Sequence, residues 1–225
     1  MSEEITTRAA FLKIGSKKNS YDLFKNGTIY CNTLHYFADL KDENNRGDFY
    51  ETVDFIKNIQ NVYEFQISQG GFHRKQSLGP AKVTRSINSN HSVGNLYCLY
   101  TLRFPLDTLQ TGVYNLNINC DIDGYCVYIH NVKEFCLRVE KAIRDKNLRF
   151  QQGFVKYLDL EQFEVRKNFF LKDNEYCNQN EYRYLIYSDS NQSLRLSIGS
   201  IADIACISPF SEFKERKLVV YNTLK

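Results

Sequence analysis

The stretch FLKIGSKKNSYDLFKNGTIYCNTLHYF, residues 11–37, decides how the fold begins. Residues 11–14 are apolar and β-prone, as in a strand. Ser16 or Ser20 can cap the helix that follows. The Asn-Gly pair at 26–27 ends that helix, because glycine adopts the left-handed conformation that is common at helix ends. The N-terminal part of the chain is therefore expected to start with a strand and a short helix.

Short strand-like segments outnumber helices in the rest of the chain. After a strand at 28–32, Thr33 is placed to cap a short helical turn. Residues 131–134 have the form of a capping box and open a run of apolar residues at helical spacing. Further strands are indicated by β-branched and aromatic residues at 62–67, 95–104, 113–118, 125–129, 149–157, 182–187, 194–198, 201–207 and 217–221. This pattern favours an α+β fold with a mixed, largely antiparallel sheet core and a few helices.

The length of 225 residues suits a single globular domain over 1–225. No apolar run approaches the ~20 residues that cross a bilayer. Residues 1–8 lack the basic start and the apolar core that are typical of a secretory signal, so we expect none. The seven cysteines are an odd number without C-x-x-C spacing, so we expect reduced core residues and no metal site. The expected protein is cytoplasmic, with no membrane segment.

Several enzyme classes lack their fixed-spacing motifs in this sequence. There is no G-x-G-x-x-G, no G-x-x-x-x-G-K-[ST] and no G-x-S-x-G, and the four histidines have no H-x-x-x-H spacing. A bound nucleotide would therefore be held without a glycine-rich phosphate loop.

A basic stretch interrupts the pattern of strands. No acidic residue occurs between Glu64 and Asp107. We interpret residues of about 66–94 as a basic loop inserted into the domain. Its cations are candidates for binding a phosphate-bearing substrate, and a solvated surface loop is the alternative. The candidates are Arg74, Lys75, Lys82 and Arg85.

Two polar constellations carry the functional signal. In the first, a predicted strand ends at Asn32 and Thr33, and a turn with two aromatic rings follows it. A loop after this turn contains Arg46, Asp48 and Glu51. Such groups can stack a flat ring and hydrogen-bond a ribose or an amide, or they can be core aromatics and surface ion pairs.

In the second constellation, a polar loop runs from Lys172 into an apolar strand. Gln179 and Glu181 are expected to share one face, because side chains two apart on a strand point the same way. One interpretation is a catalytic carboxylate with an amide partner, and the other is a structural pair between Glu181 and Arg183. The first interpretation predicts that Glu181→Gln removes activity and leaves the fold intact.

Both regions resemble the plan of ADP-ribosyltransferases, especially the DarT-like and other toxin or phage-defence branches. They also look like the two ends of a large bacterial family. The similarity lies in the strand–helix start, in NGT-I-Y-x-N-T-x-x-YF with R-G-D-x-x-E, and in a late Q-x-E-Y-R, over residues 11–51 and 172–187. Lys13 stands where that superfamily often has Arg or His on its first strand.

The resemblance implies an ADP-ribosyltransferase-like fold with NAD as a substrate and Gln179 and Glu181 as catalytic residues. Cleaving the nicotinamide–ribose bond builds positive charge on the ribose, which a carboxylate stabilises. The implied dinucleotide contacts are Lys13, Asn32, Thr33, His35, Tyr36, Phe37, Arg46, Asp48 and Glu51.

A toxin or antiphage effector is the implied role, with an antitoxin or chaperone as the partner that silences it. Because of the basic stretch, a nucleic acid, RNA or DNA, is favoured over protein as the acceptor. Two alternatives stay open: a non-catalytic module that binds nucleic acid or a partner, and a nuclease-like toxin that uses His35, Arg46 and Glu51.

Overall fold

The centre of the protein is a largely antiparallel sheet of eight strands. The computed structural model describes residues 8–40, 53–69, 72–88, 94–104, 112–116, 118, 123–160, 165–166, 168–188, 190 and 192–220. The main path of the sheet runs β13–β2–β5–β1–β7–β14, while β12 pairs with β5 and β8 with β12. These strands are β1 (Arg8–Gly15), β2 (Thr28–Thr33), β5 (Asn95–Phe104), β7 (Tyr125–Ile129), β8 (Arg149–Phe154), β12 (Glu181–Tyr187), β13 (Leu194–Ser197) and β14 (Ala205–Pro209).

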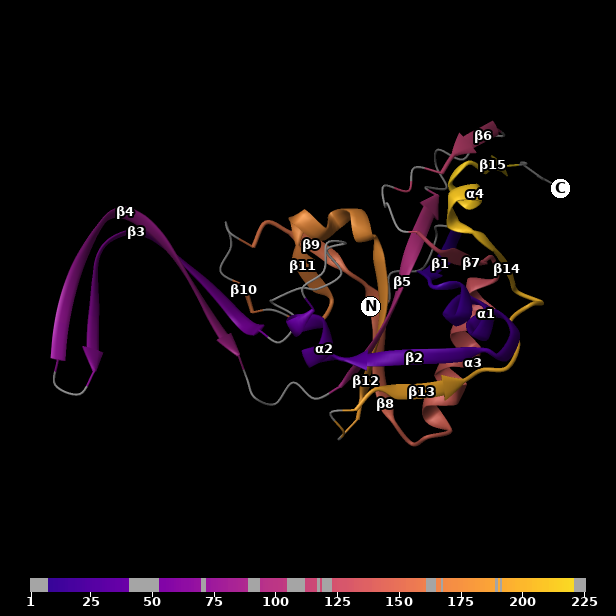
Figure 1. Cartoon of the computed structure of the whole chain (residues 1–225), viewed down its shortest axis with the longest axis horizontal. Coiled ribbons are helices and arrows are strands. Elements are labelled where there is room, and N and C mark those ends of the chain that lie inside the picture. Colours follow the sequence, from indigo (N-terminus) through magenta and orange to yellow (C-terminus); the bar gives the residue numbers. More distant parts are fainter. Residues whose placement is uncertain are drawn as a thin grey trace.

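Few helices accompany the sheet, so the prediction of an α+β fold with a largely antiparallel sheet is confirmed (Figure 1). The described helices are α1 (Lys17–Asn26), α2 (Leu34–Asp39), α3 (Val132–Arg144) and α4 (Phe210–Lys214), with a 3₁₀ turn, η2 (Asn174–Gln179). None of these helices is long and apolar enough to span a membrane.

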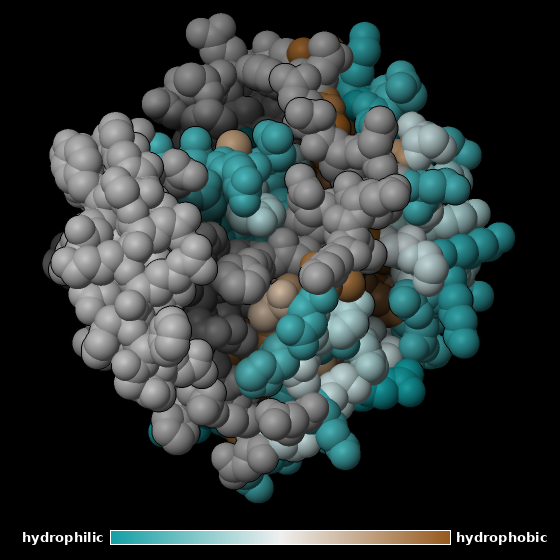
Figure 2. All heavy atoms as spheres, turned by 60° about the vertical axis from the view of Figure 1, so that its left-hand side comes forward, coloured by the Kyte–Doolittle hydropathy of each residue, from teal (hydrophilic) through white to brown (hydrophobic). Residues whose placement is uncertain are grey.

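Two hydrophobic clusters lie on opposite faces of the sheet. Phe11 packs with Phe135 and Val139 of α3, whereas the neighbouring Leu12 packs with Phe210 and Phe213 of α4. This alternation follows from strand geometry, in which successive side chains point to opposite faces. On the face shown in Figure 2, the described residues present mostly hydrophilic side chains, and apolar ones lie in the recesses between them.

The helix caps expected from the sequence are present. Ser16, Thr33 and Asn131 each accept a hydrogen bond from the backbone N–H three residues later. Gly27 follows α1 in the left-handed conformation, and its N–H donates to the Leu23 carbonyl. Local capping chemistry therefore fixes where these helices begin and where α1 ends.

The basic stretch is not the loop that the sequence suggested. Residues of that stretch form β4 (Phe72–Asn88), which pairs with β3 (Val53–Gln69) in a hairpin that extends away from the main sheet (Figure 1). β-Branched and apolar residues in both strands are compatible with this pairing, and the scattered cations and glycines concealed the pattern.

Smaller elements complete the described chain. β10 (Val165–Arg166) pairs with β3, and β6 (Gly112–Asn115) pairs with β15 (Lys217–Val220). β9 (Lys156–Leu158) pairs in parallel with β11 (Leu171–Asp173). The strand predicted for 201–207 is wrong in its first half, because residues 202–204 form a turn in which the Ile204 N–H donates to the Ile201 carbonyl.

Gly27→Ala should destabilise the fold strongly. Gly27 has φ of 64°, and an added Cβ would lie 1.8 Å from the backbone oxygen of Gly199. The left-handed conformation alone costs ~1–2 kcal/mol for a non-glycine residue, and the backbone clash adds to it. Gly199→Ala is the matched control, because Gly199 has φ of 73° but open space around its Cβ position. Thermal melts in which both variants lose the same stability would contradict the clash.

Candidate functional site

One edge of β5 is shared by two strands that reach different parts of it. β2 pairs with the start of β5, where Asn32 lies opposite Leu96, and β1 pairs with its second half, from Tyr100 onward. Cys98 lies between the two paired stretches. Its carbonyl oxygen accepts a hydrogen bond of 2.7 Å from the Lys13 ammonium. The Lys13 side chain therefore provides a hydrogen-bond donor for the Cys98 carbonyl where neither β1 nor β2 pairs with β5.

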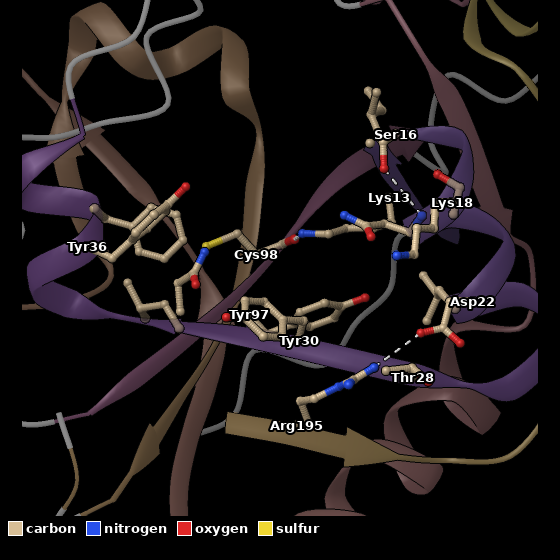
Figure 3. Close-up of a pocket in the computed structure, with 18 of the residues that line it drawn as sticks. Lys13, Ser16, Lys18, Asp22, Thr28, Tyr30, Tyr36, Tyr97, Cys98 and Arg195 are labelled. Carbon is tan, nitrogen blue, oxygen red and sulfur yellow. Dashed lines mark hydrogen bonds and ion pairs between the residues drawn. The ribbon is translucent and has the colours of Figure 1, made fainter. Parts of the chain in front are cut away.

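A pocket of about 760 Å³ occupies the space beside this opening (Figure 3). Its lining combines cations, aromatic rings, amides and hydroxyls from β1, α1, β2, α2, β5 and β13. The residues that decide its character are Lys13, Lys18, Arg195, Asp22, Asn19, Asn32, Ser16, Thr28, Tyr30, Tyr36, Phe37 and Tyr97. The lining contains three cationic side chains and one carboxylate, a balance that suits an anionic ligand that carries flat rings.

Four of the residues predicted as dinucleotide contacts meet in this pocket, namely Lys13, Asn32, Tyr36 and Phe37. The rings of Tyr36 and Phe37 pack edge to face, with centroids 5.3 Å apart. Thr33 instead caps α2 with its hydroxyl.

The other predicted contacts are not brought to the pocket. His35 is exposed and is not among the lining residues. Arg46, Asp48 and Glu51 lie outside the described residues. Of the three residues of the nuclease-like alternative, only His35 belongs to the described part of the chain, so the structure does not test their arrangement.

Sequence reasoning missed several lining residues because they come from other strands. Tyr97 is 3% exposed, and the Lys13 ammonium lies 4.6 Å from its ring centroid. Arg195 lies 3.5 Å from Asp22. The hydrogen bond from Asn26, together with the charge of Arg195, lowers the pKa of Asp22. No local motif marks Tyr97 or Arg195, since strand pairing alone brings them here.

Glu181 lies in a buried cluster of charges on β12, which pairs with the edge of β5 opposite the one that borders the pocket. Its Oε1 accepts a hydrogen bond of 2.8 Å from Lys172, and its Oε2 accepts one of 2.5 Å from Nε of Arg183. The side chains of Lys172 and Arg183 are each 2% exposed, and that of Glu181 is 10% exposed. Glu181 is therefore a buried ion-pair partner, as the structural interpretation of the Glu–Arg pair anticipated.

The carboxyl of Glu181 stays ionised in this environment. Burial by itself raises its pKa, but the charges and hydrogen bonds of Arg183 and Lys172 outweigh burial and hold the pKa well below its usual range. The three charges leave one net positive charge in the cluster. Removing the single negative one would leave two cations buried without compensation.

Gln179 and Glu181 come together for a different reason from the one that the sequence suggested. Gln179 is the last residue of η2 and not part of a strand, and Asn180 between them is left-handed, with φ of 40°. Both side chains instead accept hydrogen bonds of 2.8 Å from Lys172. The expectation of one shared strand face is therefore wrong in its reason, although the two side chains do share a partner.

The buried cluster lies one strand away from the pocket. Gln179 and Glu181 are not among the lining residues, but Cys98 is, and Cys98 lies opposite Arg183 in the β5–β12 ladder. Asn32 and Glu181 pair with positions 96 and 100 of β5, which point to the same face. The candidate site thus consists of a pocket and a neighbouring charge cluster on the two edges of one strand.

The four cations proposed to bind a substrate all lie on β4. Arg74 pairs with Ile67, Lys75 with Gln66 and Arg85 with Lys57 in the hairpin, and Lys82 lies between them in the same strand. Only their backbone belongs to the described part of the structure.

Comparison with family models, curated proteins and solved structures finds no match.

Among the described residues, no three His, Cys, Asp or Glu side chains gather in a way that could hold a metal ion. Of the cysteines expected in the core, Cys177 and Cys206 are exposed. The geometry of the pocket and of the charge cluster is therefore the basis for any functional assignment.

Glu181→Gln should destabilise the protein, contrary to the expectation from sequence. Removing one partner of a buried ion pair leaves the other charge uncompensated and typically lowers the free energy of unfolding by ~3–5 kcal/mol. This corresponds to a fall of roughly 6–20 °C in Tm for a chain of this size. Asp145→Asn, which breaks the exposed pair with Lys141, is the control and should cost less than about 1 kcal/mol.

Acid titration provides the second readout for this variant. Because the pKa of Glu181 is lower in the folded state, its contribution is complete above the unfolded value of about 4.3 and is lost as pH falls further. Urea denaturation from pH 6 to pH 2 should therefore show a steeper loss for the wild type than for Glu181→Gln. If the free energy of unfolding falls equally with pH in both proteins, the pKa of Glu181 is not lowered in the folded state.

Proposed function

We propose that this protein is an NAD-dependent ADP-ribosyltransferase that holds the dinucleotide in the pocket beside β5. The observation that carries the proposal is the convergence of Lys13, Asn32, Tyr36 and Phe37 on that pocket. The resemblance implies these four residues as dinucleotide contacts. Asn32, Tyr36 and Phe37 lie close together in the sequence, whereas Lys13 comes from β1 and joins them in one concavity with further cations.

The chemistry of the lining supports a dinucleotide. NAD has two flat ring systems, two riboses and two phosphate charges, and the pocket offers aromatic rings, hydrogen-bonding side chains and an excess of cations. Its volume of about 760 Å³ falls within the roughly 300–1,000 Å³ of small-molecule sites. Lys13, which replaces the Arg or His of the resembled family, contributes a positive charge at the opening of the sheet.

Glu181 supports the transfer step in this proposal. An ionised carboxylate stabilises the positive charge that develops on the ribose when the nicotinamide bond breaks. Lys172 and Arg183 each use one of its oxygens, and a carboxylate has about four acceptor positions. Acceptor positions for a ribose hydroxyl therefore remain on Glu181. Because Glu181 and Gln179 do not line the pocket, the proposal requires the dinucleotide to extend from the pocket past Cys98 to reach them.

A nucleic acid, RNA or DNA, is the favoured acceptor, and an antiphage or toxin role follows from the resemblance. The extended β3–β4 hairpin carries Arg74, Lys75, Lys82 and Arg85 along a single strand. Cations spaced along a strand can each meet a different phosphate and release a counterion, whereas NAD offers only two phosphate charges. An antitoxin or chaperone would then control the enzyme in the cell.

The burial of Glu181 favours a second candidate function, a non-catalytic binding module. An acidic side chain that is 10% exposed and paired with two cations serves the fold whether or not the protein catalyses a reaction. In this alternative the pocket binds a nucleotide, or the hairpin binds a nucleic acid or partner, without bond cleavage.

Tyr36→Ala should weaken NAD binding by roughly 5- to 150-fold, because stacking of a base on an aromatic ring contributes ~1–3 kcal/mol. The wild type should bind NAD in calorimetry and release nicotinamide when an acceptor is present. Leu137→Ala is the matched control, since Leu137 is a similarly exposed apolar side chain on α3 outside the pocket.

The outcomes of this experiment separate the two candidates. Binding that needs Tyr36 together with nicotinamide release supports the transferase. Binding without release supports the module. Equal affinity in all three proteins would mean that the pocket is not the dinucleotide site.

Replacing Arg74, Lys75, Lys82 and Arg85 with Ser should weaken nucleic-acid modification steeply and leave acceptor-free NAD hydrolysis nearly unchanged. Each lost phosphate contact should flatten the salt dependence by ~0.7 log unit on a single strand. The control replaces four exposed cations elsewhere, Lys133, Lys141, Arg144 and Lys156, and so changes the net charge equally. If both sets have the same effect, the hairpin cations contribute only to net charge.

A further inference from the structure

We propose that Lys172 is the positioning residue of the site, which fixes Gln179 and Glu181 through one buried ammonium group. The inference rests on the proposed function for its catalytic meaning and on geometry for its structural meaning. Lys172 lies within the stretch that carries the sequence resemblance, but the resemblance gives it no role, and it does not line the pocket.

The ammonium group of Lys172 joins two side chains that the backbone does not align. It donates to Oε1 of Gln179 and to Oε1 of Glu181, both at 2.8 Å. A lysine ammonium only donates hydrogen bonds, so the amide of Gln179 must turn its oxygen toward Lys172 and its nitrogen away. One side chain thereby sets the rotamer of Glu181 and the amide orientation of Gln179.

Lys172 is itself held firmly. It is 1% exposed, and its ammonium lies 5.1 Å from the ring centroid of Tyr176. In the parallel β9–β11 ladder it lies opposite Tyr157, whose hydroxyl accepts a hydrogen bond of 2.9 Å from the Glu181 N–H. Two neighbouring residues of this small sheet therefore hold Glu181, one by its side chain and one by its backbone.

The other groups that face the carboxylate come from two further strands. Arg183 of β12 binds its second oxygen and also donates to the Phe169 carbonyl at 2.8 Å. Cys98 of β5 lies opposite Arg183, and burial raises the pKa of its thiol to about 12, so it is neutral. Removing the Lys172 charge therefore leaves a neutral Glu181–Arg183 pair and not a stranded charge.

The test uses Lys172→Met, which removes the ammonium and retains an unbranched side chain. Carboxyl ¹³C NMR of selectively labelled glutamate should show the Glu181 resonance titrating at higher pH than in the wild type, because one of its two cationic partners is gone. The side-chain amide resonances of Gln179 should shift or broaden. An unchanged Glu181 titration together with unchanged Gln179 resonances would overturn the proposal, whatever the protein catalyses.

Kinetics of nicotinamide release supply the catalytic readout. Because Lys172 does not line the pocket, kcat should fall ~10- to 100-fold while KM for NAD stays within about twofold. Gln179→Ala combined with Lys172→Met should lose less than the product of the two single losses, since both disturb one unit. Lys133→Met on the surface of α3 is the control. Multiplicative losses, or a rise in KM with unchanged kcat, would refute the positioning role.

Failure of the proposed function is recognised separately. If the wild type releases no nicotinamide, the transferase assignment fails, and the NMR arms still decide whether Lys172 holds the pair. If the wild type is active and Lys172→Met is equally active, the positioning role fails and the transferase stands.

Discussion

The hydrogen bond from Lys13 to the Cys98 carbonyl is the interaction on which the candidate site depends. A buried strand edge needs a partner for each backbone group. β5 meets that demand with β2 at one end and β1 at the other, and the two strands cannot reach the residue between them. The lysine supplies the missing donor at 2.7 Å. The sheet can therefore stay open beside Cys98, and the pocket occupies that opening.

The charge cluster on the other edge of β5 obeys a second constraint. A buried ion pair often stabilises no more than well-packed apolar residues of the same volume, because desolvation offsets the attraction. The fold alone therefore gives no strong reason for Lys172, Glu181 and Arg183 to replace a core of aliphatic side chains. What the cluster does provide is an ionised carboxylate in one fixed orientation. In the proposed function, that property serves the chemistry at the ribose.

Local signals in the sequence predicted the parts of the fold that depend on local interactions. The caps Ser16, Thr33 and Asn131 were predictable because each side chain bonds a backbone group three residues away. Part of β3 was predicted as a strand at 62–67, but β4 was not, since its cations and its Gly-Pro pair mask the alternation. In the site, the meeting of Asn32 with Tyr36 follows from their closeness in sequence. The contributions of Tyr97 and Arg195 depend on long-range strand pairing, which leaves no local signal.

The pocket and the cluster share one electrostatic environment through Cys98. Burial raises the pKa of its thiol, Glu181 raises it further, and Lys13, Arg183 and Lys172 lower it. Charges from both edges of β5 thus act on one side chain in a region of low dielectric. An anion bound beside Lys13 would act through space to favour the protonated form of nearby acidic groups. Two cations on the carboxylate keep it ionised against that effect, which a single partner would do less well. In the proposed function, the excess positive charge of the cluster would keep the carboxylate ionised beside the phosphates of the dinucleotide.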